Sequence, residues 1–188
     1  MLIDCLEAEL KKPLFELLEN RLCVSPSSSG LQIWELMEED TGSSNKKFTV
    51  VGDAKYDLVI IRPNSLMMNY FNNSIHYLTS IPDFLIFINR KNDYLNTDVV
   101  VIDMKSTGAD NKQLRSQFRN GKNIAMYLAK VTNREVRYCK FLKSSIIASK
   151  NKRATNPQKG VFSFESGFFS TKSKQLNILE IVRHHKGR

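Results

Sequence analysis

The sequence is poor in cysteine and has no long hydrophobic run. Its three cysteines, Cys5, Cys23 and Cys139, lie far apart and form no C-x-x-C pair, which argues against a disulfide framework or a zinc knuckle. No apolar run approaches the roughly 18 residues that a membrane helix needs, and the first residues carry acids where a signal peptide is basic. We therefore expect a soluble, intracellular protein of a reducing compartment, cytoplasmic or nuclear, with no membrane partner.

Acidic residues are scarce in the second half of the chain. Residues 105–188 contain 19 Lys and Arg but only 4 Asp and Glu, whereas residues 1–104 contain 9 and 15; the two balances, +15 and −6, sum to the net charge of +9. Clustered positive charge favours a polyanionic partner, because neutralising phosphates releases counterions. A solvated basic face that aids solubility is the simpler alternative.

The first part of the chain is predicted to contain helices and strands. Leucines at helical spacing, with glutamates between them, predict an amphipathic helix over residues 4–22. Residues 30–44 are expected to form a short helix that ends in a loop. The apolar runs 48–51 and 57–61 are typical of strands, and we expect Gly52 to interrupt them.

The middle of the chain predicts a hairpin, a helix and a fourth strand. Residues 83–89 and 97–105 are apolar, β-rich runs joined by a polar turn, which is typical of a hairpin. Residues 110–130 predict a helix, and "EVRYCKFL", residues 135–142, alternates as a strand. The inner face of that helix is expected to carry Leu114, Phe118, Ile124, Ala125 and Leu128.

The segment "VVVIDMK", residues 99–105, places an acid and a base at the end of a buried strand. Strand alternation sends Asp103 and Lys105 to one side and Met104 to the opposite, buried side, and the hairpin can bring Asp83 alongside them. Two converging carboxylates repel each other, and a hard cation such as Mg²⁺ or Mn²⁺ relieves that repulsion. A nearby lysine can help to deprotonate an attacking water, so these residues predict metal-dependent hydrolysis of a phosphodiester.

The motifs "IPDFLIFI" and "VVVIDMK", with Asp83 and Asp103 20 positions apart, resemble the PD-(D/E)xK nuclease superfamily, which includes restriction enzymes, Holliday-junction resolvases and recombination-helicase nucleases. The resemblance covers about residues 4–141. It implies an α/β, restriction-endonuclease-like core, with a central mixed β-sheet of four or five strands flanked by helices. The whole chain, 1–188, would be one nuclease-like domain with a basic C-terminal segment, 142–188.

The resemblance also implies an activity and roles for residues. The protein would be a deoxyribonuclease, a Mg²⁺- or Mn²⁺-dependent endonuclease, in which Asp83 and Asp103 bind the metal and Lys105 is the catalytic lysine. Many members add an acid from the first helix, for which Glu16 and Glu9 are candidates, although a solvated helix face is the simpler explanation of any one of these glutamates.

Glutamines and basic residues after the lysine extend the predicted site. Gln113 and Gln117, four apart on one helical face, are expected to reach the metal water or the DNA backbone. "KQLRSQF" resembles the glutamine motif of the recombination-helicase nucleases, whereas "KST" resembles the resolvases. The cations expected to contact a nucleic-acid backbone are Arg115, Arg119, Lys122, Lys143, Lys152 and Arg153.

A second D-x-K, Asp53-Ala54-Lys55, follows no Pro-Asp strand, and we expect it to form an exposed turn. Two other functions are compatible with the sequence. A catalytically inactive nucleic-acid-binding module with the same fold, acting as a subunit of a larger nucleoprotein assembly, needs the basic half but not the carboxylates. A basic protein that binds another protein's acidic surface needs neither. We expect the nucleic acid to be DNA and not RNA. A homodimer would suit an enzyme that cuts both strands.

Overall fold

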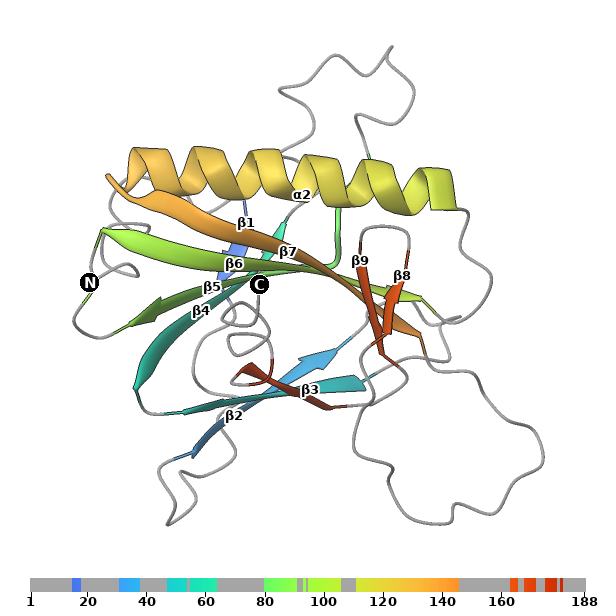
Figure 1. Ribbon diagram of the computed structural model, residues 1–188, viewed down its shortest axis with the longest axis horizontal. Coiled ribbons are helices and arrows are strands. Elements are labelled where there is room, and N and C mark those ends of the chain that lie inside the picture. The colour runs from blue at the N-terminus through green and yellow to red at the C-terminus, as the bar shows by residue number, and fades with distance from the viewer. Residues whose placement is uncertain are drawn as a thin grey trace.

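The protein is a mixed α/β structure with two β-sheets and one helix among the residues that the computed structural model describes (Figure 1). These residues are 15–17, 31–37, 47–53, 55–63, 80–90, 93, 95–105, 111–145, 163–165, 168–171, 175–178 and 180. In chain order the elements are β1 (Phe15–Leu17), β2 (Leu31–Met37), β3 (Lys47–Asp53), β4 (Tyr56–Pro63), β5 (Phe84–Arg90), β6 (Asn96–Lys105), α2 (Asn111–Val131), β7 (Glu135–Ser145), β8 (Ser163–Glu165), β9 (Phe168–Thr171) and β10 (Gln175–Asn177).

The larger sheet has seven strands in the order β1-β4-β5-β6-β7-β9-β8. Strands β4, β5 and β6 are antiparallel neighbours, as the predicted hairpin requires. Strand β7 lies parallel to β6, and α2 forms the crossover between them. The predicted count of four or five strands is wrong, because the short strands β1, β8 and β9 extend the two edges of the sheet.

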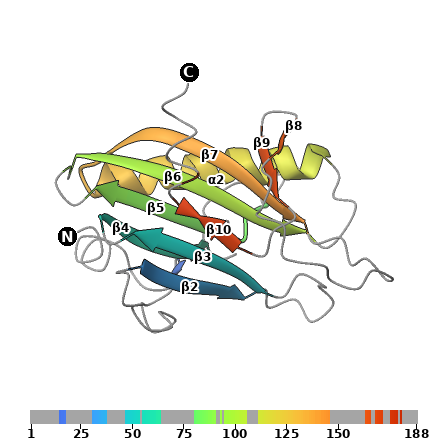
Figure 2. The same ribbon diagram turned by 60° about the horizontal axis from the view of Figure 1, so that its bottom comes forward.

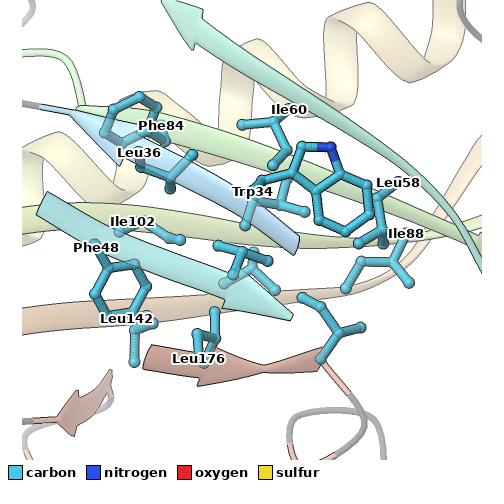
Figure 3. Packing of buried hydrophobic residues seen from close by; sticks show 14 of the residues in the cluster. Trp34, Leu36, Phe48, Leu58, Ile60, Phe84, Ile88, Ile102, Leu142 and Leu176 are labelled. Carbon is cyan, nitrogen blue, oxygen red and sulfur yellow. The ribbon is translucent and has the colours of Figure 1, made fainter. Parts of the chain in front are cut away.

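The structure has three layers. Helix α2 lies along one face of the seven-stranded sheet, and a three-stranded sheet, in the order β10-β3-β2, lies on the other face (Figures 1 and 2). The core between the two sheets combines Trp34 and Leu36 of β2 with residues of β4, β5 and β6, among them Ile60, Phe84 and Ile102 (Figure 3). The central strands are therefore buried on both faces, which explains why their sequences are continuous apolar runs.

Side chains along β6 alternate between the two cores. Val99 and Val101 pack in the cluster under α2, whereas Val100, Ile102 and Met104 pack against the small sheet. The prediction that Met104 points to a buried face is confirmed.

Helix α2 is close to its predicted range of 110–130. All five side chains expected on its inner face are buried in the cluster against β6 and its neighbours. Arg115, Arg119, Lys122 and Lys130 are exposed on the outer side. No helix among the described residues is both long and apolar enough to span a membrane.

Two predicted helices are wrong where the structure describes them. Residues 15–17 of the first form strand β1, which pairs with β4, and residues 31–37 of the second form β2; the rest of 4–22 lies outside the described residues. In β2 the buried side chains, Trp34 and Leu36, alternate with partly exposed neighbours, a period of two that suits pairing with β3.

Gly52 lies inside β3 and does not interrupt it. A Cβ atom there would stand 2.6 Å from Leu58 Cδ1 and 2.9 Å from Trp34 Cζ3, closer than side chains tolerate. The glycine therefore marks a close approach of side chains from both sheets.

A β-bulge sets the register between β6 and β7. Thr97 pairs with Val136, but Asp98 pairs with Tyr138, so Arg137 is the extra residue in β7. The Arg137 guanidinium forms two hydrogen bonds with the buried Asp98 carboxylate: Nε donates to Oδ1 at 3.0 Å and Nη2 donates to Oδ2 at 2.8 Å. The hydrogen bonds to Asp98 raise the pKa of Arg137. The ion pair thus fixes the bulge in place.

We expect Arg137→Ala to destabilise the protein, because it leaves the buried Asp98 carboxylate without its guanidinium partner. The loss should be about 2 kcal/mol in the free energy of unfolding, measured in urea. The matched control is Arg119→Ala on the exposed face of α2, where Arg119 forms no ion pair with a described residue; that change should stay within about 0.5 kcal/mol. Equal losses from both changes would contradict a role for the ion pair.

Candidate active site

The two aspartates of the predicted motifs lie at the same end of neighbouring strands. Phe84 of β5 pairs with Ile102 of β6, so Asp83, one step before Phe84, and Asp103, one step after Ile102, fall on the next rung. Asp103 is fully buried, with 0% exposure, and Asp83 is partly buried. The Asp83 carboxylate reaches across to β6, where Oδ2 accepts a hydrogen bond from the Met104 backbone N–H at 2.5 Å.

Helix α2 holds the segment that leads to Asp83. The Gln117 amide donates from Nε2 to the Ile81 carbonyl at 3.0 Å, and the Asn120 amide donates from Nδ2 to the Ser80 carbonyl at 2.7 Å. Both amides are buried, with 6% and 5% exposure. These hydrogen bonds satisfy backbone carbonyls just outside the sheet, and they fix the chain immediately before Asp83.

Gly121 lets the same segment lie close against the helix. A Cβ at this position would stand 2.8 Å from Pro82 Cγ and 2.5 Å from Val101 Cγ1. The absent side chain leaves room for the proline that precedes Asp83, so the Pro-Asp motif is packed between α2 and β6.

The first turns of α2 lie at the same end of the molecule as the aspartates. Strand β6 ends at Lys105 and α2 begins at Asn111, and the helix then runs back along the sheet (Figure 1). Asp103 lies two residues beyond Val101, which packs under α2, and residues two apart on a strand point to the same face. The Asp103 side chain therefore lies on the helix face of the sheet.

The two glutamines predicted to act together have different environments. Gln113 is exposed, whereas Gln117 is buried and bonded to Ile81, so Gln117 does not lie on the outer face of the helix. The Gln117 Oε1 atom is buried and accepts no hydrogen bond from a described residue. Sequence spacing gave no sign of Asn120, which contributes the second hydrogen bond to this segment.

Lys105 ends β6 opposite Ser145, and its side chain lies outside the described part of the structure. Glu16 lies in β1 and not in a helix, at the position paired with Arg62. The Arg62 guanidinium lies over the Phe84 ring, which belongs to the face opposite the Asp103 face. This register lends no support to Glu16 as a third acid, and its role stays a prediction.

The predicted nucleic-acid contacts fall into three groups. Arg115, Arg119 and Lys122 are exposed on α2, as expected. Lys143 is partly buried in β7 and pairs with Asp103, a position that the sequence did not indicate. Lys152 and Arg153 lie outside the described residues.

The second D-x-K forms the turn that was predicted for it. The Lys55 backbone N–H donates to Asp53 Oδ1 at 3.0 Å, and the Lys55 side chain is exposed. An aspartate that bonds the backbone two residues on is typical of an Asx turn.

Other metal-binding or nucleophilic groups are few in the part of the chain that the structure describes. Among the described residues, no three His, Cys, Asp or Glu side chains gather in a way that could hold a metal ion. Burial raises the pKa of the Cys139 thiol to about 11, although the charge of Lys122 opposes this shift. The thiol is therefore protonated at neutral pH, as expected for a packing residue and not for a nucleophile.

We expect Asn120→Ala to loosen the segment before Asp83, because the Ser80 carbonyl loses its buried donor. Amide hydrogen exchange of a peptide covering residues 80–84 should become faster, and the free energy of unfolding should fall by about 1–3 kcal/mol. Asn123→Ala, an exposed position on the same helix, is the control and should leave the exchange of this peptide unchanged. Unchanged exchange in Asn120→Ala would show that the helix does not hold the segment.

Comparison with known proteins identifies no family for this chain: no protein-family model, curated protein or solved structure matches it.

Proposed function

We propose that this protein is a metal-dependent nuclease, an endonuclease that hydrolyses phosphodiester bonds in DNA, and that its core is restriction-endonuclease-like. One observation carries the proposal: the register of β5 and β6 sets Asp83 and Asp103 on one rung at the end of the sheet. The antiparallel β4, β5 and β6, followed by the α2 crossover and the parallel β7, support the fold part of the proposal.

The residues at this rung fit a hard divalent cation. Mg²⁺ takes one or two protein carboxylates together with waters and phosphate oxygens, and Asp83 and Asp103 supply two. The buried Gln117 Oε1, which accepts no hydrogen bond from a described residue, is a further oxygen beside the segment that carries Asp83. Asp83 and Asp103 would hold Mg²⁺ or Mn²⁺, which, when bound, would offset the negative charge of the reacting phosphate.

The chain's own groups would then orient and protect the reaction. The hydrogen bond from Met104 N–H holds the Asp83 carboxylate toward β6, and the full burial of Asp103 strengthens its electrostatic interactions. Lys105, two residues beyond Asp103, would take the proton from the attacking water, the role that the resemblance to PD-(D/E)xK nucleases implies.

We expect Asp103→Asn and Lys105→Ala each to lower DNA cleavage by roughly 100-fold or more, because the first removes a carboxylate that would hold the metal and the second removes the group that would take the proton from the attacking water. The measurement is cleavage of single-stranded, duplex and branched DNA, and of RNA, with Mg²⁺, Mn²⁺ or EDTA.

The chain contains a matched control for this experiment. Asp53→Asn and Lys55→Ala make the same changes in the second D-x-K, which lies in an exposed turn, and they should leave cleavage unchanged. Full cleavage by folded Asp103→Asn and Lys105→Ala proteins would contradict the proposed site, and cleavage that survives EDTA would contradict the proposed metal dependence.

A nucleic-acid-binding module without catalysis is the second candidate, and the composition of α2 favours it. The helix contains no Asp or Glu between Asn111 and Val131. Arg115, Arg119 and Lys122 are exposed on the face turned away from the sheet, and none forms an ion pair with a described residue. Cations three and four residues apart on one helix face repel one another, and a phosphate backbone would relieve this repulsion.

For either function we expect the triple change Arg115→Gln, Arg119→Gln and Lys122→Gln to weaken duplex binding. The slope of log K against log salt should become shallower by about 2 to 3, since each lost phosphate contact removes about 0.9 from it. The measurement is fluorescence anisotropy of a labelled oligonucleotide.

The control removes three exposed cations elsewhere, Lys47, Lys55 and Arg90, as glutamine changes. Both triple variants lower the net charge from +9 to +6, since each loses three positive charges. An equal effect of the two variants would mean that total charge, and not α2, determines binding. Retained binding without Mn²⁺ uptake, measured by calorimetry, would favour the non-catalytic module.

A further inference from the structure

Lys143 lies beside Asp103 on the neighbouring strand. The parallel register pairs Asp103 of β6 with Lys143 of β7. The preceding pairs show which faces correspond: Val101 and Phe141 both pack in the cluster under α2, and Ile102 and Leu142 both pack against the small sheet. Lys143 therefore shares the helix face of the sheet with Asp103.

This pairing extends the row of polar residues across three strands. Asp83 falls on the same rung as Asp103 on the β5 side, and Lys143 pairs with Asp103 on the β7 side. The register of β6 and β7 thus brings a lysine that is 40 positions beyond Asp103 in the sequence to the end of the sheet where the two carboxylates lie. The row has the two components that phosphodiester chemistry needs, acids for a cation and a separate positive charge for the phosphate.

The Lys143 side chain is partly buried and forms no ion pair with a described residue. An ammonium that served only to neutralise a carboxylate would be expected within ion-pair distance of one. A backbone-tracking lysine would be expected on the outer surface with Arg115 and Arg119. Lys143 fits neither description, because it lies within the sheet at the proposed site.

We propose that Lys143 is a catalytic residue whose ammonium binds a non-bridging oxygen of the scissile phosphate. The inference rests on the proposed nuclease function. In the reaction, water oxygen bonds to phosphorus, the bond from phosphorus to the leaving oxygen breaks, and one proton of the water ends on that leaving oxygen. Lys143 keeps its proton throughout and stabilises the negative charge that grows on the phosphate.

The test compares Lys143→Gln with Lys140→Gln. Both changes remove one positive charge from β7, but Lys140 lies over the Phe169 ring, which packs against the cluster on the other face of the sheet. Lys143→Gln should lower kcat roughly 100-fold with little change in KM, Lys140→Gln should stay within about twofold of wild type, and Lys143→Arg, which keeps the charge, should recover part of the rate. A lysine that only tracks the backbone would instead raise KM.

A second readout does not depend on activity. The positive charge of Lys143 opposes cation binding at Asp103, so Lys143→Gln should tighten Mn²⁺ binding, measured by calorimetry, by roughly threefold or more, and Lys140→Gln should leave it unchanged. Should Lys143→Gln unfold, Lys143→Met keeps the aliphatic stem and gives the same comparison.

The outcomes separate this inference from the proposed function. An active wild-type enzyme with equal kcat and equal Mn²⁺ affinity in Lys143→Gln and Lys140→Gln overturns the role of Lys143 and leaves the nuclease in place. A wild-type protein that cleaves no nucleic acid and takes up no Mn²⁺ overturns the nuclease proposal itself.

Discussion

The register between β6 and β7 is the constraint on which the candidate site depends. A single extra residue, Arg137, is accommodated in β7 and held by two hydrogen bonds to the buried Asp98. Because side chains alternate along a strand, a pairing without this bulge would place Asp103 level with Leu142 and turn the polar end of β7 toward the other core. An ion pair near the start of the strands therefore determines which residue accompanies Asp103 at their end.

Helix α2 links three parts of the structure. Its apolar face covers β6 and β7, its buried amides Gln117 and Asn120 hold the segment before Asp83, and its outer face presents cations. Strand β6 ends at Lys105 and α2 begins at Asn111, so the helix that packs the sheet also holds the segment that leads to Asp83. Packing and positioning are thus carried by the buried side of one element, and charge by its exposed side.

Burial on both faces explains where a reactive site can form. The middle of β5 and β6 is apolar because α2 covers one face and the small sheet covers the other. Charged groups placed there would lose their hydration without compensation. They occur instead at the strand ends, as Asp83 and Asp103 at one end and Asp98 with Arg137 at the other.

The sequence by itself determined the hairpin of β5 and β6, helix α2 with its inner face, strand β7 and the places of Asp83 and Asp103 at the ends of neighbouring strands, because long apolar runs and helical spacing are local signals. It did not determine that residues 15–17 and 31–37 are strands, since short segments follow the partner that they pair with. Only the tertiary structure decided that Lys143 stands beside Asp103, because that register depends on the bulge at Arg137. It also decided that Gln117 is buried, because the partner of its amide, the Ile81 carbonyl, lies 36 positions away in the sequence.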